Sequence, residues 1–203
     1  GIGAAGIAVA NLLMAAGVSD VVGVDRDGIV TARRKDARDP IFRRFGKQTN
    51  PRDLRGGKAV ALDGADVFIG LSAGNTLSVA DVATMADDAI VFAMANPTPE
   101  IDPAVARQHA AVVATGRSDF PNQINNVLCF PGLFRGLLDV RASAVTDEVK
   151  LAAARAIAGI VDPAERGPDM IIPSPLDRRV VPVVAAAVAE AATRSGAAPV
   201  EDA

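Results

Sequence analysis

The sequence predicts an α/β protein built on a doubly wound parallel sheet, and two observations carry this prediction. The first is a set of four short apolar runs, each ending in a turn-forming or small polar residue: 21–25, 67–72, 90–96 and 111–116. They lack the polar alternation of half-exposed strands, as is typical of parallel strands covered by helices on both faces. The second is that helix-length segments separate most of these runs, because alternation of strand and helix produces such a sheet.

Five segments carry the signals of helices, namely 3–16, 78–85, 103–109, 146–160 and 180–194. Ser78, Asp102 and Thr146 are suited to cap the three middle ones. Pro131 and Gly132 are expected to begin a further helix. That helix is expected to present three side chains to the core: Leu133, Leu137 and Leu138. The proline-rich stretch 162–179 is expected to be a rigid linker, and residues 197–203 to be frayed.

Composition bounds the function. The 203 residues are 50% hydrophobic and 22% charged, which is enough for one ordinary core and excludes disorder. A net charge of -3 gives no reason to expect nucleic acid as a partner. The segment 26–58 is strongly basic, and we interpret it as a solvated helical face. Cys129 is the single cysteine, so the chain cannot form an internal disulfide, which fits the reducing cytoplasm. His109 is the single histidine, which excludes a metal site built from several histidines.

The first nineteen residues carry no charged side chain, but they read neither as a signal peptide nor as a membrane span. They have no basic n-region, and four glycines together with Asn11 dilute their hydrophobicity. No membrane partner is expected. A chain that opens on Gly-Ile-Gly is expected to be cut from a longer protein.

The opening residues match the pattern G-x-G-x-x-G, with glycines at positions 1, 3 and 6. In this pattern the missing side chains let the backbone turn tightly and approach a pyrophosphate. Asp25 follows Gly6 by nineteen residues and ends the next predicted strand, where an acid hydrogen-bonds the adenosine ribose. The combination predicts a Rossmann-like, dinucleotide-binding sheet whose first strand, before Gly1, is lacking. The alternative is that the glycines serve only close packing.

We therefore assign residues 1–145 to a dinucleotide-binding domain truncated at its N-terminus, and 146–203 to a C-terminal helical extension of the same domain. The choice between NAD and NADP stays open. Asp25 disfavours a 2′-phosphate, whereas the neighbouring Arg26 could bind one. Asp25 could also be only a turn residue.

Two loops follow predicted strands at the edge where such sheets bind ligands, namely 96–100 and 116–126. Asn and Pro are turn formers, so both could be simple turns. The second loop, however, holds three Asn and one Gln within five residues, 122–126. Amides both donate and accept hydrogen bonds, which suits a carboxylate or carboxamide ligand.

These loops carry a specific resemblance. Residues 92–101 (FAMANPTPEI) and 114–132 (ATGRSDFPNQINNVLCFPG) resemble the cofactor-domain signatures of bacterial malic enzymes. With the GIGAAGIA opening and the VDRDG turn, the similarity covers essentially the whole chain. The resemblance implies oxidation of malate with NAD or NADP, then decarboxylation to pyruvate with a divalent metal, Mg or Mn. It also implies a homodimer or larger assembly of the full-length protein.

Site residues follow from the resemblance by motif. Asn96 is implied to contact the nicotinamide end and malate, and Asn126 to contact malate. The implied pyrophosphate and ribose contacts are Gly1, Gly3, Ala4, Ala5, Gly6 and Asp25. Ser72, after its strand, is a weaker candidate for lining the cofactor, and it could instead be a turn hydroxyl.

The family takes its Tyr acid, Lys base and metal-binding carboxylates from sequence upstream of the glycine motif. We therefore expect no catalytic and no metal-binding residue in this chain, and expect the fragment alone to be inactive. The chain contains no Tyr, and its four lysines match no catalytic motif. Two alternatives remain, a non-catalytic dinucleotide-sensing module and another two-domain dehydrogenase.

Overall fold

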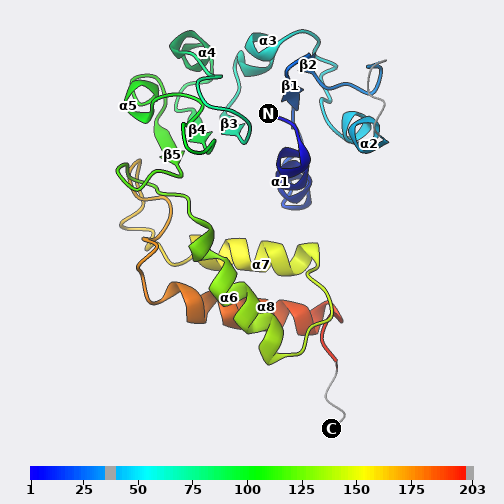
Figure 1. The fold of residues 1–203 in the computed structure, drawn as a ribbon, viewed down its shortest axis with the longest axis vertical. Coiled ribbons are helices and arrows are strands. Elements are labelled where there is room, and N and C mark those ends of the chain that lie inside the picture. The colour runs from blue at the N-terminus through cyan, green and yellow to red at the C-terminus, as the bar shows by residue number, and fades with distance from the viewer. Residues whose placement is uncertain (35–39, 200–203) are drawn as a thin grey trace. The chain divides into compact units, whose positions relative to one another are not determined.

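The computed structural model describes residues 1–34 and 40–199 (Figure 1). The chain forms two compact units, Gly1–Gly116 and Arg117–Ala203, which we call the sheet unit and the helical unit. This spatial division does not test the predicted assignment of 1–145 and 146–203 to a domain and its extension, which stays a prediction.

Three of the four predicted strands form a parallel sheet in the sheet unit. They are β3 (Val67–Gly70), β4 (Ile90–Ala93) and β5 (Val112–Thr115), in the order β3-β4-β5. Val67 is in register with Ile90, and Ile90 with Val112. The crossovers contain α4 (Val79–Ala83) and α5 (Pro103–Ala106). The α/β parallel architecture predicted from the apolar runs is confirmed.

The first apolar run forms a different structure. Only Val24–Asp25 is a strand, β1, and it pairs antiparallel with β2 (Gly28–Ile29). The rest of the run finds its hydrogen bonds in loops, because the carbonyls of Val21 and Gly23 accept from the N–H groups of Asn50 and Val30. The expectation that 21–25 joins the parallel sheet is therefore wrong for the described residues.

Helix α1 (Ala4–Ala15) follows the glycine motif as predicted. It packs through Ile7 and Ala10 against Val30 and Phe45, in a small cluster of buried side chains. Phe45 belongs to α2 (Pro40–Gln48), which lies in the basic segment, and α3 (Lys58–Leu62) follows it. The predicted basic helical face covers part of this segment, and its residues 35–39 lie outside the described part of the chain.

The caps predicted for two helices of the sheet unit are confirmed, but both helices are shorter than predicted. The Ser78 hydroxyl accepts from the Asp81 N–H while the Asp81 carboxylate accepts from the Ser78 N–H, which forms a capping box at α4. Asp102 accepts from the Ala104 N–H, and Pro103 opens α5. Helix α5 ends at Ala106, so the exposed His109 lies beyond it.

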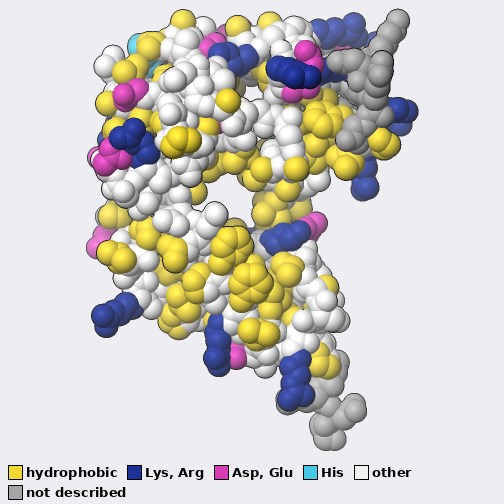
Figure 2. All heavy atoms as spheres, in the orientation of Figure 1, with side chains coloured by type: hydrophobic (Ala, Val, Ile, Leu, Met, Phe, Trp, Pro, Cys, Tyr) yellow, Lys and Arg dark blue, Asp and Glu magenta, His cyan; other side chains and the backbone are white. Residues whose placement is uncertain are grey.

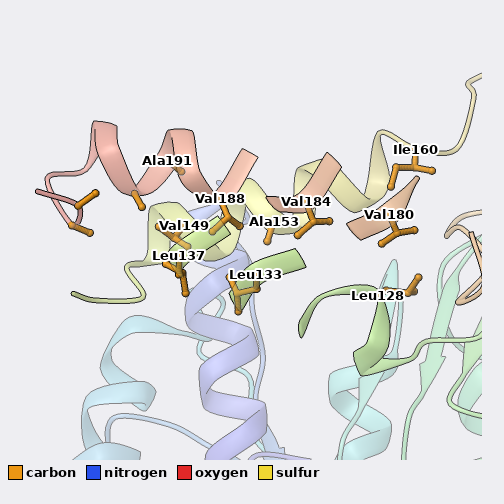
Figure 3. Close-up of a cluster of buried hydrophobic side chains, with 13 residues drawn as sticks. Leu128, Leu133, Leu137, Val149, Ala153, Ile160, Val180, Val184, Val188 and Ala191 are labelled. Carbon is orange, nitrogen blue, oxygen red and sulfur yellow. The ribbon is translucent and has the colours of Figure 1, made fainter. Parts of the chain in front are cut away.

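The helical unit consists of the short 3₁₀ helix η1 (Asn126–Leu128) and three helices, α6 (Phe130–Asp139), α7 (Asp147–Ala158) and α8 (Val180–Arg194). Thr146 caps α7 as predicted. Thirteen buried residues, almost all Ala, Val and Leu, form one cluster among these helices (Figure 3). A Cβ built on Gly132 would lie 2.6 Å from Cβ of Val184, so glycine lets α6 approach α8 closely.

Two predictions for the helical unit need correction. Leu133 and Leu137 are buried as predicted, but Leu138 is 75% exposed. Successive helical residues point about 100° apart, so Leu138 turns away from the face that Leu137 buries. Ala197 and Ala198 are buried and hydrogen-bonded to the carbonyl of Ala192 rather than frayed, while 200–203 lie outside the described residues.

The linker 162–179 contains no helix or named strand, as predicted, only an isolated bridge between Gly167 and Met170. The buried Asn122 anchors this linker. Its side-chain nitrogen donates to the carbonyl of Pro168 over 2.7 Å, and its side-chain oxygen accepts from the N–H of Ile171 over 2.9 Å.

Candidate functional site

The glycine motif forms a tight turn that only glycine can make at two of its positions. A Cβ on Gly6 would lie 2.5 Å from the carbonyl oxygen of Gly1. A Cβ on Gly1 would lie 2.5 Å from Cβ of Ser72, so the turn sits directly against the loop that follows β3. Packing inside the chain therefore explains Gly1 and Gly6.

Gly3 differs, because a Cβ there would meet nothing within 4 Å. Gly3 is exposed, has extended backbone angles, and occupies the N-cap of α1 without a capping side chain. Ala4 and Ala5 in the first turn are exposed as well. An uncapped N-terminus of a twelve-residue helix presents backbone N–H groups and the positive end of the helix dipole, which suits a phosphate.

Asp25 lies at the end of β1, as predicted, and is held by partners on one oxygen. Its Oδ1 accepts from Nη1 of Arg34 and from the N–H of Asp27, both over 2.8 Å. Arg34 also donates through Nη2 to Asp27 over 3.2 Å. Among the described residues, no hydrogen bond reaches Oδ2 of Asp25, so this oxygen can accept from a ribose hydroxyl.

Sequence reasoning missed Arg34 and singled out Arg26 instead. The Arg26 side chain is 93% exposed and lies 3.7 Å from Asp27, whereas that of Arg34 is 14% exposed. Asp25 and Arg34 are nine residues apart and meet across the β1–β2 hairpin. A run of basic residues does not reveal which of them turns inward.

These groups surround an open cleft of about 1460 Å³ in the sheet unit. Its lining includes Gly1, Gly3, Asp25, Arg34 and Ser72. A shallower hollow beside Asp25 is lined by basic side chains, among them Arg33, Arg55 and Lys58. Figure 2 shows Lys and Arg gathered near β1, β2 and α2, with acidic side chains among them at β1 and β2.

The carboxyl ends of β3 and β4 bring two further predicted residues into one loop cluster. Ser72 and Asn96 are both exposed, and the Asn96–Pro97 peptide bond is cis. The side chain of Glu100, which sequence reasoning quoted only as part of the loop 96–100, joins the two loops. Its carboxyl oxygens accept from the N–H groups of Ser72 and Ala95.

The amide-rich loop belongs to the helical unit from Arg117 onward. Arg117 donates through Nε to Asp119 over 2.9 Å, and this hydrogen bond lowers the pKa of Asp119. Asn122 anchors the linker, and Asn125 accepts from the N–H of Val127 and so caps η1. Asn126 is exposed, and among the described residues its side chain makes no hydrogen bond. Of the paired asparagines, Asn126 is the one available to a ligand.

Three further kinds of functional feature concern the described residues, namely a reactive thiol, a metal-binding cluster and a membrane-spanning helix. Cys129 is half-buried, and burial raises the pKa of its thiol, so it is a weak nucleophile. Within residues 1–34 and 40–199, no three His, Cys, Asp or Glu side chains gather in a way that could hold a metal ion. None of the helices in this part of the chain has the length and apolar character needed to cross a membrane.

Comparison with known proteins places these features in a family. The family described as "Malic enzyme, NAD binding domain" matches residues 1–193. The NAD-dependent malic enzyme of Geobacillus stearothermophilus is 54% identical over 198 residues, which cover 98% of this chain and 41% of that protein. The NADP-dependent malic enzyme of Rhizobium meliloti is 44% identical over 223 residues, covering 100% of this chain and 29% of that protein.

A solved structure gives the same result for the fold. The malic enzyme of Pyrococcus horikoshii superposes with a TM-score of 0.89 at 43% identity, covering all of this chain and 48% of that one. The chain thus spans less than half the length of each of these relatives.

Proposed function

The chain belongs to the malic enzyme NAD-binding domain family, and on this premise we propose that it is the dinucleotide-binding part of an enzyme that converts malate to pyruvate and CO₂ with reduction of NAD or NADP. One observation carries the proposal. Gly3 opens onto free space at an uncapped helix N-terminus, and Asp25 lines the same cleft.

In this proposal the sheet unit holds the dinucleotide through its own backbone and one carboxylate. The N–H groups at Gly3, Ala4, Ala5 and Gly6 bind the pyrophosphate, because the first-turn N–H groups of a helix lack intrahelical partners. Oδ2 of Asp25 accepts from the adenosine ribose, while Arg34 holds Oδ1. Gly1 and Ser72 shape the turn that brings these groups together.

Asn96 and Asn126 serve the reacting end. Asn96 follows β4 in the loop beside Ser72 and contacts the nicotinamide carboxamide and malate, and Asn126 contacts malate. Their amides can donate to a carboxylate and accept from a carboxamide, so they orient ligands rather than transfer protons. When bound, the dinucleotide accepts the hydride that malate loses.

The longer protein supplies the remaining groups in this proposal: a Tyr acid, a Lys base and the carboxylates for Mg or Mn. The described residues contain no set of three ligands for such an ion, so we assign no step to it here. We also propose that the complete enzyme is cytoplasmic and works as a homodimer or larger assembly. It binds neither nucleic acid nor membranes in this proposal.

Three measurements test the proposal. Calorimetric titration of this chain with NAD and with NADP is expected to show binding of at least one of them. Malate-dependent pyruvate formation, measured with Mn on a protein of the relatives' full length that contains this chain, is expected with the same dinucleotide.

Asn126→Ala should lower kcat/KM for malate and leave the dinucleotide Kd nearly unchanged, with Asn11→Ala as an exposed control.

The outcomes separate the alternatives. Dinucleotide binding without pyruvate formation would favour a sensing module or another dehydrogenase. An Asn126→Ala protein that loses dinucleotide affinity but keeps normal malate kinetics would contradict the role given to Asn126.

A further inference from the structure

Glu100 is the single acidic or basic side chain that is fully buried in the described part of the chain, with 0% exposure. Burying a carboxyl group is costly unless hydrogen bonds replace its water. No lysine, arginine or histidine contacts this carboxyl group among the described residues. The amino group of Gly1 interacts with it electrostatically, and backbone N–H groups provide its hydrogen bonds.

Two backbone N–H groups do so, one from each neighbouring loop. Oε1 accepts from the N–H of Ser72 over 3.2 Å, and Oε2 accepts from the N–H of Ala95 over 2.9 Å. Ser72 lies beyond the end of β3, and Ala95 lies beyond the end of β4, directly before Asn96. One side chain therefore joins the two loops that carry Ser72 and Asn96.

The protein makes room for this carboxyl group at the end of β3. A Cβ on Gly70 would lie 2.7 Å from Oε2 and closer still to the other carboxyl atoms. Gly70 has ordinary backbone angles, so its lack of a side chain serves space rather than conformation. Gly70 and Glu100 thus form a matched pair, thirty residues apart in sequence.

Glu100 also affects the glycine turn indirectly, because Gly1 packs directly against Ser72. Displacement of the Ser72 backbone would disturb the contact of Ser72 with Gly1. Three segments assigned to the dinucleotide, at Gly1, Ser72 and Asn96, therefore depend on one buried carboxyl group.

We propose that Glu100 is a positioning residue, whose buried carboxyl group sets the loops of Ser72 and Asn96 in the geometry that receives the nicotinamide half of the dinucleotide. The proposal rests on the proposed function. Glu100 touches neither dinucleotide nor malate in it, and acts only through the two backbone N–H groups.

The chemistry requires a carboxyl group rather than an amide. Both oxygens of Glu100 accept from N–H donors, and a glutamine would have to turn its NH₂ group toward one of them. That buried N–H would then lose its acceptor, and the loop that carries it would shift. Glu100→Gln is therefore expected to release one loop although it barely changes the size of the side chain.

The test compares two ligands on the same chain. Glu100→Gln should weaken NAD binding about tenfold, the cost of one unsatisfied buried N–H. Adenosine, which carries no phosphate, reports the ribose end at Asp25, and its affinity should change less than about twofold. Glu165→Gln, the same chemical change at an exposed site, is the control and should alter neither affinity.

Each outcome decides a question. Equal losses for NAD and adenosine would mean that Glu100 only maintains the fold, and an unchanged NAD affinity would mean that it positions nothing. Either result overturns the positioning role while leaving the proposed function intact. A wild-type chain that binds neither NAD nor NADP overturns the proposed function and this proposal together.

A measurement on the wild-type chain covers the case in which Glu100→Gln does not fold. The amide resonances of Ser72 and Ala95, followed by NMR, should shift when NAD is added and shift much less with adenosine. Resonances that respond to neither ligand, in a chain that binds NAD, would overturn the proposal.

Discussion

The sheet unit and the helical unit bury their side chains in different ways. The helical unit has one apolar cluster of thirteen buried residues, in which small side chains let α6 and α8 approach closely. The sheet unit divides its core into clusters of eleven and four residues. Of the five buried polar or charged residues described, four lie in the sheet unit, namely Thr49, Asn50, Glu100 and Thr115.

This difference follows from how strands and helices satisfy their backbone hydrogen bonds. Parallel strands end together at one edge, and the loops there need polar side chains to satisfy their backbone groups. Helices satisfy their own backbone groups internally, so the helical unit can rely on close apolar packing. Phe130 and Phe134 of α6 are exposed. Figure 2 shows hydrophobic side chains gathered over this helix.

The largest expected effect tests the helical cluster. Leu137→Ala should lower the free energy of unfolding by about 2–5 kcal/mol, because it opens a cavity in the cluster. Leu138→Ala, its exposed neighbour, should change it by less than about 0.5 kcal/mol. Urea unfolding followed by circular dichroism measures both. Equal losses would break the comparison, since Leu138 would then be as buried as Leu137.

The next effect separates packing from binding in the sheet unit. Gly6→Ala should lower stability by about 1–3 kcal/mol, because the new Cβ meets the carbonyl of Gly1. Gly3→Ala should leave the melting temperature nearly unchanged, because a Cβ there meets nothing within 4 Å, and should weaken NAD binding about tenfold, because the proposed pyrophosphate site adjoins Gly3. Normal NAD affinity in the Gly3→Ala protein would mean that the dinucleotide does not bind close to Gly3.

A third test concerns cofactor choice. Asp25→Ala removes the proposed ribose acceptor and releases Arg34, so the ratio of NAD to NADP affinity should fall about tenfold. Asp27→Ala removes a more exposed partner of Arg34 and should change the ratio far less. Titration with both dinucleotides measures the ratios. An unchanged ratio in Asp25→Ala would reduce Asp25 to a turn residue.

The smallest expected effect concerns the capping box of α4. Burial opposes the ionisation of Asp81, but hydrogen bonds from Lys58 and Ser78 outweigh it, so the pKa of Asp81 is lowered. A lowered folded-state pKa contributes stability above the unfolded value, about 3.9, and this contribution is lost as pH falls through the folded value. Ser78→Ala should cost about 1 kcal/mol.

The pH dependence is checked by urea unfolding at pH 6, 4 and 3. The wild-type protein should exceed Asp81→Asn in stability most at pH 6, and the difference should shrink toward pH 3. Asp87→Asn, in an exposed turn, is the control. A difference that grows on acidification would contradict the assigned pKa direction.

Much of the fold follows from local pattern. The three runs that became β3, β4 and β5 are apolar on both sides, and Ser78, Asp102 and Thr146 cap the helices predicted for them. These signals work because a cap or a buried strand needs only neighbouring residues of the right type. Leu138 shows where local pattern fails. It is apolar and follows the buried Leu137 directly, but its residue type does not reveal that it is exposed.

The sequence by itself determined the glycine motif, the acid that follows it and the amide-rich loop, and with them the family. Only the tertiary structure decided that Arg34 rather than Arg26 holds Asp25, that Asn122 and Asn125 are used within the chain, and that Glu100 joins two loops. The physical reason is distance along the chain. Apart from the local cap that Asn125 forms, these contacts join residues up to 49 positions apart, and folding alone selects which donor meets which acceptor.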